Sequence, residues 1–120
     1  MKIMIVDDST AMRLIVKKTL RQAGFEGHEI VEFEDGSLAH GAITRNKPDL
    51  VLSDWNMPQM TGIELLEKLN AAGIKVKFGF VTTEATPEMR TRAESAGASF
   101  LISKPFTAEM FKETLTPFIR

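Results

Sequence analysis

The sequence predicts a single doubly wound α/β domain with a five-stranded parallel sheet in the strand order 2-1-3-4-5. Two observations lead to this fold class. Five short apolar runs, each typical of a strand, alternate along the chain with five segments of helical periodicity. Residues that favour turns and helix caps lie between them. The length of 120 residues suits one domain and leaves no room for a second.

The first strand and helix occupy the beginning of the chain. Ile3 to Val6 form an unbroken apolar run, as expected of a strand buried on both faces of a sheet. Ser9 or Thr10 can cap the helix that follows, and Gly24 can end it. The expected core-facing stripe of this helix consists of Met12, Ile15, Val16, Leu20 and Ala23, with the basic residues Arg13, Lys17, Lys18 and Arg21 outside it.

The middle of the chain continues the alternation. Residues 28–34 alternate apolar and polar side chains imperfectly, which favours an edge strand. Asp35 can cap a second helix. The apolar residues of that helix are Leu38, Ala39, Ala42 and Ile43. Leu50 to Ser53 is again a buried-strand run, and Thr61 with Glu64 has the spacing of a capping box at the start of a third helix.

Two further pairs of strand and helix complete the pattern. Val76 to Val81 predicts the fourth strand, with Gly79 inside it at a point where a neighbouring group needs close approach. Thr86-Pro87 is typical of a helix start. Phe100 to Ser103 predicts the fifth strand, and Thr107 to Thr116 the fifth helix.

Composition and charge exclude several functional classes. Fifteen basic and sixteen acidic residues give a net charge of -1, which disfavours nucleic-acid binding and attraction to an anionic membrane. Without cysteine there is no disulfide, thiolate metal site or thiol nucleophile. The apolar start MKIMIV is stopped by two acids too early for a signal peptide or a membrane span, so we expect a cytoplasmic domain.

Polar residues follow four of the predicted strands directly. Asp7 and Asp8 come after the first strand, Asp54 after the third, Thr82 after the fourth and Lys104 after the fifth. Parallel strands carry their carboxyl ends to one edge of the sheet, where open α/β folds bind ligands. We therefore expect these side chains to meet in one pocket.

The chemistry of this set points to phosphoryl transfer. Three converging carboxylates repel one another and need a cation, and oxygen ligands without His or Cys favour Mg²⁺ or Mn²⁺. A carboxylate can hold an acyl phosphate as a covalent intermediate, with Lys104 as a second cation and Thr82 as a hydroxyl donor. The sequence contains no Walker loop or GxGxxG turn, so nucleotide binding has no motif to support it.

Four motifs in order, VDDST, LVLSDWNMPQMTG, VTTEA and SKPF, resemble the receiver domain of two-component response regulators. The resemblance covers residues 1–120 and implies the flavodoxin-like (βα)5 fold. The DWNMP and VT-x-EA segments are most similar to stand-alone chemotaxis regulators of the CheY type.

The resemblance implies roles for individual residues. Asp54 is the expected acceptor of a phosphoryl group from a sensor histidine kinase. Asp8 and Asp54 would ligate Mg²⁺ directly, Asp7 mainly through water, and the backbone carbonyl of Asn56 would complete the protein ligands.

Other residues are expected to contact the phosphoryl group or respond to it. Lys104 would bind the group or pair with the acceptor, and the peptide between Lys104 and Pro105 is commonly cis in the family. Thr82 would move toward the phosphate on activation. At the switch position that is often Tyr or Phe in the family, this chain has Leu101, while Phe100 should point to the opposite face of the sheet.

Two residues border the expected pocket. Trp55 follows Asp54 directly and is expected to be partly exposed beside the site. Thr83 is bulkier than the Ala or Gly often found next to the family threonine, and is expected to narrow access to Asp54.

The function expected from these observations is a phospho-acceptor switch that catalyses its own phosphorylation and slow dephosphorylation, rather than a conventional multiple-turnover enzyme. Because no further domain follows the fifth helix in this sequence, we expect the output to be a protein partner rather than an attached DNA-binding domain. The partner would bind through the fourth helix, the fifth strand and the fifth helix, and we expect the protein to be a monomer. In chemotaxis that partner would be the flagellar motor switch.

Alternatives remain open from sequence alone. A stand-alone relay receiver, passing phosphate to a histidine phosphotransfer protein, fits nearly as well. A haloacid dehalogenase-type phosphatase also uses Asp, Thr, Lys and Mg²⁺, but its DxD motif normally follows the first strand, and Asn56 stands where a second acid would follow Asp54. A metal-independent binding module of flavodoxin type would leave the three acids unexplained.

Overall fold

A computed structural model describes residues 1–119, which form five parallel strands and five helices in strict alternation. The strands are β1 (Lys2–Val6), β2 (Glu29–Phe33), β3 (Leu50–Ser53), β4 (Lys77–Thr82) and β5 (Phe100–Ser103). The helices are α1 (Thr10–Gln22), α2 (Gly36–Arg45), α3 (Gly62–Ala71), α4 (Pro87–Ser95) and α5 (Ala108–Leu115). The sheet order is β2-β1-β3-β4-β5, which confirms the predicted fold class and strand order.

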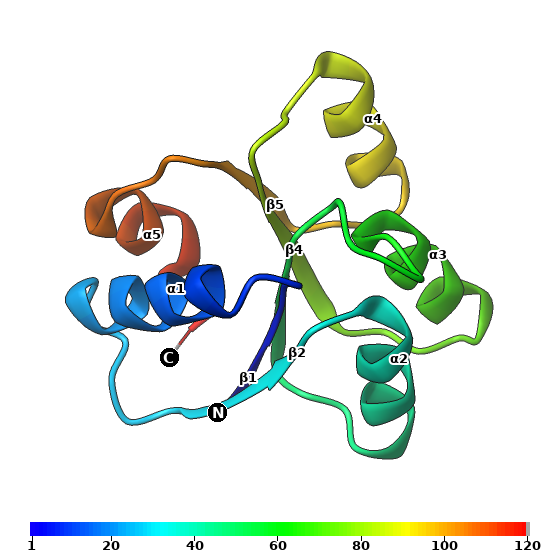
Figure 1. Cartoon of the computed structure of the whole chain (residues 1–120), viewed down its shortest axis with the longest axis horizontal. Helices are drawn as coiled ribbons and strands as arrows, with labels where there is room; N and C mark the ends of the chain where they lie inside the picture. The colour runs from blue at the N-terminus through cyan, green and yellow to red at the C-terminus, as the bar shows by residue number, and fades with distance from the viewer. Residues whose placement is uncertain (120) are drawn as a thin grey trace.

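The helices cover both faces of the sheet, with α1 and α5 on one side and α2, α3 and α4 on the other (Figure 1). Side chains of α1 and α5 pack against the sheet in one core cluster that includes Val16, Leu20, Phe111 and Leu115. The other cluster joins α2, α3 and α4 to the opposite face. Within residues 1–119, none of the helices has both the length and the apolar character needed to cross a membrane.

The predicted capping residues begin the helices. The hydroxyl of Ser9 accepts a hydrogen bond from the backbone N–H of Met12 at the start of α1. At α3, Thr61 and Glu64 form both halves of a capping box. Asp35 and Thr86 cap α2 and α4 as predicted, each accepting a hydrogen bond from a backbone N–H. Thr107, predicted as the first residue of the fifth helix, instead caps it, and α5 begins at Ala108. These caps fix where the chain turns from each strand edge into the next helix.

Gly79 allows the close approach that its place inside a strand predicts. It lies beside Phe100 in the β4–β5 pairing, and a side-chain carbon built on Gly79 would be 2.1 Å from the Phe100 ring. The ring therefore occupies the space that a side chain on β4 would fill. As the alternation predicts, Phe100 packs on the α1 and α5 face and Leu101 on the other.

Two helix positions expected in the core are instead exposed. Ile15 of α1 is 45% exposed and Leu38 of α2 is 50% exposed. In α1 the sheet covers a narrower stripe, and Thr19 is buried within it because its hydroxyl donates a hydrogen bond to the carbonyl of Ile15 at 2.8 Å. In α2 the sheet-facing positions are Ala39 and Ile43.

Candidate functional site

Three carboxylates converge at the carboxyl edge of the sheet. β1 and β3 are hydrogen-bonded neighbours, and the N–H of Asp54 donates to the carbonyl of Val6 at 2.8 Å. Asp7 and Asp8 follow β1, so Asp54 emerges directly beside them. Among residues 1–119, Asp7, Asp8 and Asp54 form a group of possible metal ligands, with one carboxylate oxygen from each lying within 4.8 Å of the others. The site lies where the strand order reverses, between β1 and β3.

Lys104 brings a cation into this group. Its Nζ lies 3.2 Å from Oδ2 of Asp7 and 3.7 Å from Oδ1 of Asp54. The side chains of Lys104, Asp7 and Asp54 are 9%, 6% and 13% exposed, so these charges interact with little screening by water. The N–H of Lys104 also donates to the carbonyl of Thr82 at 2.7 Å, which fixes the backbone from which the side chain reaches the acids.

Burial raises the pKa of the Asp54 carboxyl above its usual value, and the charges of Asp7 and Asp8 act in the same direction. The Lys104 ammonium and the backbone N–H of Trp55 oppose this increase, the latter donating to Oδ1 of Asp54 at 2.8 Å. In the absence of a bound cation, this site therefore disfavours the ionised form of Asp54 relative to a solvated aspartate.

The neighbouring residues Thr82 and Thr83 differ in their exposure to solvent at this edge of the sheet. Thr82, the last residue of β4, is fully buried, and its hydroxyl accepts from the N–H of Glu84 at 3.4 Å. Thr83 is exposed. The hydroxyl of Thr82 is therefore held from within the sheet, whereas Thr83 faces solvent beyond the strand.

Three predicted residues remain, namely Asn56, Pro105 and Leu101. Asn56 is exposed in the turn after β3, and the Lys104–Pro105 peptide bond is cis. Leu101 is half-buried against the core on the α3 and α4 side of the sheet.

The expectation that Trp55 is partly exposed is wrong. Trp55 is 7% exposed, and its ring centroid lies 4.8 Å from that of Phe80 in a tilted arrangement. Only its backbone N–H faces Asp54, because the indole turns into the apolar core. A polar neighbour in sequence did not indicate the direction of the side chain.

The structure adds residues to the site that the sequence patterns did not single out. A side-chain carbon built on Gly62 would lie 2.1 Å from the carbonyl oxygen of Asp54, so only glycine lets α3 start this close to the end of β3. The N–H of Gly62 donates to the carbonyl of Trp55 at 2.8 Å. Arg13 donates to the carbonyl of Asp7, although helical periodicity indicated only that it lies outside the apolar stripe. The sequence feature that could have indicated this contact was the position of Arg13 near the start of the helix that follows the two acids.

The donor set fits a hard divalent cation. The groups that converge are carboxylate oxygens, which suit Mg²⁺ or Mn²⁺ better than the softer metals that prefer His or Cys. Asp7, Asp8 and Asp54 would hold the ion. In its absence Lys104 offsets part of their repulsion.

Doubly wound α/β domains form a class that binds ligands at the edge where the strand order reverses, and in this chain the acids lie at that edge. Comparison with known proteins narrows the class. A family model described as the response regulator receiver domain matches residues 3–116. The chain belongs to the response regulator receiver domain family.

Individual relatives match over almost the whole chain. The chemotaxis protein CheY-3 of Vibrio cholerae serotype O1 is 43% identical over 117 residues, which cover 96% of this chain and 88% of that protein. The chemotaxis protein CheY of Pseudomonas aeruginosa is 40% identical over 117 residues, covering 96% of this chain and 93% of that protein. The solved structure of Vibrio cholerae chemotaxis protein CheY4 has a TM-score of 0.84 and 32% identity, and the match covers 98% of each chain.

Proposed function

We propose that residues 1–120 form one receiver domain in which Asp54 accepts a phosphoryl group from a histidine kinase. The observation that carries the proposal is the meeting of Asp54 with Asp7, Asp8 and Lys104 in one partly buried group. The membership of this chain in the receiver domain family supports the same reaction.

The chemistry is a displacement at phosphorus. A carboxylate oxygen of Asp54 attacks the phosphorus of a phosphohistidine, the O–P bond forms as the P–N bond breaks, and the electron pair of that bond remains on the imidazole nitrogen. Bound Mg²⁺ would offset the negative charge of the acceptor and of the phosphoryl oxygens. Lys104 would contribute a second positive charge, and the Thr82 hydroxyl would donate to a phosphoryl oxygen.

Phosphorylation would then shift a two-state equilibrium and alter the surface formed by α4, β5 and α5. We propose that this surface binds a protein partner in chemotaxis, as the names of the relatives suggest, and that the protein acts as a cytoplasmic monomer without binding nucleic acid. Thr82 and Leu101 would take part in this shift, Thr82 by moving toward the phosphate.

Intact mass measurement tests the acceptor. With Mg²⁺ and a small acyl phosphate donor, the wild type should gain the mass of one phosphoryl group, and Asp54→Asn should abolish the gain. Asp49→Asn, at an exposed aspartate before β3, is the matched control and should be modified like the wild type. A wild type that stays unmodified contradicts the proposal.

A binding experiment tests the partner. The phosphorylated protein should bind a flagellar motor-switch protein more tightly than the unphosphorylated protein does. Preferential binding and phosphoryl transfer to a histidine phosphotransfer protein would instead identify a relay receiver.

A further inference from the structure

The guanidinium of Arg13 joins three segments beside the acidic edge. Its Nη1 donates to the backbone carbonyl of Asp7 at 2.6 Å, its Nε to Oε1 of Glu32 at 3.2 Å, and its Nη2 to the Thr10 hydroxyl at 3.2 Å. The side chain is 13% exposed, which is low for an arginine in the first turns of a surface helix. One planar group therefore ties the end of β1 to α1 and to the edge strand β2.

The hydrogen bond from Arg13 holds the backbone from which the side chains of Asp7 and Asp8 extend. The N–H of Asp7 donates to the carbonyl of Phe33 at 3.1 Å, and its carbonyl accepts from Arg13, so both polar groups of its backbone are held. The carbonyl belongs to the peptide plane that joins Asp7 to Asp8. Holding that plane restricts the backbone positions from which the Asp7 and Asp8 side chains start, while the Asp7 carboxylate itself accepts from the N–H of Ser9 at 2.9 Å and from Lys104 at 3.2 Å.

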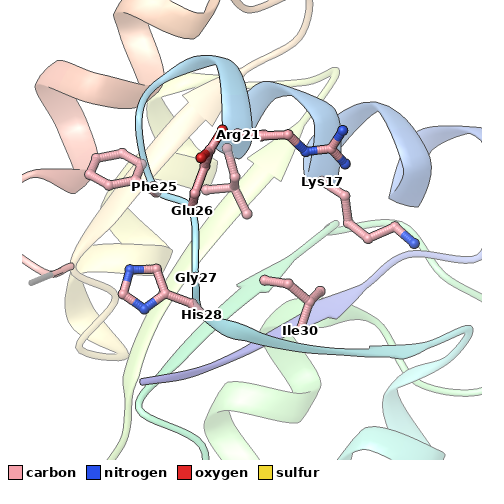
Figure 2. A pocket seen from close by; sticks show the side chains of 8 residues that line it. Lys17, Arg21, Phe25, Glu26, Gly27, His28 and Ile30 are labelled. Atoms are coloured by element: carbon pink, nitrogen blue, oxygen red, sulfur yellow. The ribbon is translucent and has the colours of Figure 1, made fainter.

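Glu32 holds Arg13 in turn. Its other oxygen accepts from Nζ of Lys17 at 2.8 Å, and this hydrogen bond is the main cause that lowers the pKa of Glu32. Lys17 also borders a surface groove of about 360 Å³ between the end of α1 and the start of β2. Figure 2 shows the Lys17 side chain extending along β2, away from Phe25 and His28 on the other side of that groove. Lys17 thus serves the Glu32 pair rather than forming a cationic pocket with His28.

We propose that Arg13, held by Glu32, is a positioning residue that orients the Asp7–Asp8 peptide so that the acidic group can bind its divalent cation. The proposal rests on the part of the proposed function that places a divalent cation at this site. Arg13 acts through the backbone of Asp7. It makes no contact with the phosphoryl group in this role.

Calorimetric titration with Mg²⁺ distinguishes a positioning role of Arg13 from a purely electrostatic one, because the two roles predict opposite changes in Mg²⁺ affinity. If Arg13 acted only as a nearby cation, it would repel Mg²⁺, and Arg13→Met would tighten binding. A positioning role predicts the opposite, a loss of about tenfold in Mg²⁺ affinity, the usual scale for residues that orient metal ligands. Arg13→Lys keeps the charge but lacks the planar fork, and should also bind Mg²⁺ more weakly than the wild type.

Glu32→Gln leaves Arg13 in place and tests the same role if Arg13→Met unfolds. Because Arg13 stays in place, Glu32→Gln should weaken Mg²⁺ binding by less than the roughly tenfold loss expected for Arg13→Met. The control is Lys18→Met, which removes an exposed cation of the same helix and should leave the affinity unchanged. In the phosphorylation assay, Arg13→Met should raise the Mg²⁺ concentration needed for half-maximal rate more than it lowers the rate at saturating Mg²⁺.

The outcomes distinguish this proposal from the acceptor role. Unchanged or tighter Mg²⁺ binding in Arg13→Met and Glu32→Gln overturns the positioning role, even if both proteins are phosphorylated. A wild type that binds Mg²⁺ but is never phosphorylated overturns the acceptor role alone. A lowered melting temperature with unchanged Mg²⁺ affinity would assign Arg13 a purely structural role and would also overturn the proposal.

Discussion

The acidic edge at β1 and β3 and the helix α4 are held by different means. At the edge, charged side chains that are almost fully buried contact one another, and Lys104 links segments far apart in the chain. Within α4, all of which the structure describes, Ala93 is the one buried residue. Contacts of α4 with α3 include the exposed pair Arg92–Glu67 and a hydrogen bond from the Asn70 side chain to the carbonyl of Ala96 at 2.7 Å. The acidic groups are therefore held rigidly, while the proposed output surface contains a helix that can move at little cost.

Replacing Lys104 by Met should give the largest effect. It leaves Asp7 and Asp54 buried without their cation, and loss of one partner of a buried pair costs about 3 kcal/mol in the free energy of unfolding. Urea denaturation without divalent ions should show this loss, and saturating Mg²⁺ should recover part of it. Lys112→Met, at an exposed lysine of α5, should change stability little. Equal losses in the two variants would mean that the acidic edge is no more tightly coupled than the surface.

Replacing Asp54 by Asn should stabilise the protein at neutral pH by about 1 kcal/mol, the usual scale of a point mutation. Because the pKa of Asp54 is higher in the folded protein than in the unfolded chain, the ionised group lowers stability as pH rises through the folded pKa. Below the unfolded pKa the group is protonated in both states and this penalty is absent. The gain from Asn should therefore shrink as pH falls through the folded pKa.

Denaturation curves over a pH series, with a chelator present, would measure this dependence. Asp49→Asn provides the exposed control. A gain that stays constant with pH would mean that Asn stabilises by packing rather than by removing a buried charge.

Removing the Asn70 amide should have a smaller, local effect. Asn70→Ala loses the hydrogen bond to Ala96, at a cost of about 0.5 to 1 kcal/mol. Hydrogen exchange should rise in α4 more than in β3, because α4 has little other burial. Asn46→Ala, at the exposed end of α2, should leave exchange in α4 unchanged. A uniform rise across the molecule would show that α4 does not open separately.

The smallest effect is expected at Glu67. Its pair with Arg92 joins side chains that are 44% and 54% exposed, so Glu67→Gln should cost less than about 0.5 kcal/mol and the cost should vanish in high salt. A double-mutant cycle with Arg92→Gln measures the coupling directly. A coupling above about 1 kcal/mol would indicate that α4 is tied to α3 more firmly than its burial suggests.

Sequence patterns predicted the strands, the caps and the meeting of the acids, since these follow from local periodicity and from the shared edge of parallel strands. They failed for Ile15, Leu38 and Trp55, because periodicity identifies an apolar flank but not how far a neighbouring element covers it. The contacts of Arg13 were also not predicted, because helical periodicity carries no information about partners in distant segments. Its partner Glu32 is 19 residues away in the sequence and lies on the strand β2, whereas Arg13 lies on the helix α1.

The packing of the Phe100 ring over Gly79 also determines the register between β4 and β5. Slipping β5 by one residue would turn every side chain of that strand to the opposite face and bring the ring against a residue that has a side chain of its own. This pair therefore acts as a register lock for the last strand. With the lock in place Thr82 lies opposite Ser103, and Lys104 leaves the sheet at the one step from which it reaches the acids. The apolar contact between Gly79 of β4 and Phe100 of β5 thus determines the register that brings Lys104 within reach of the acids.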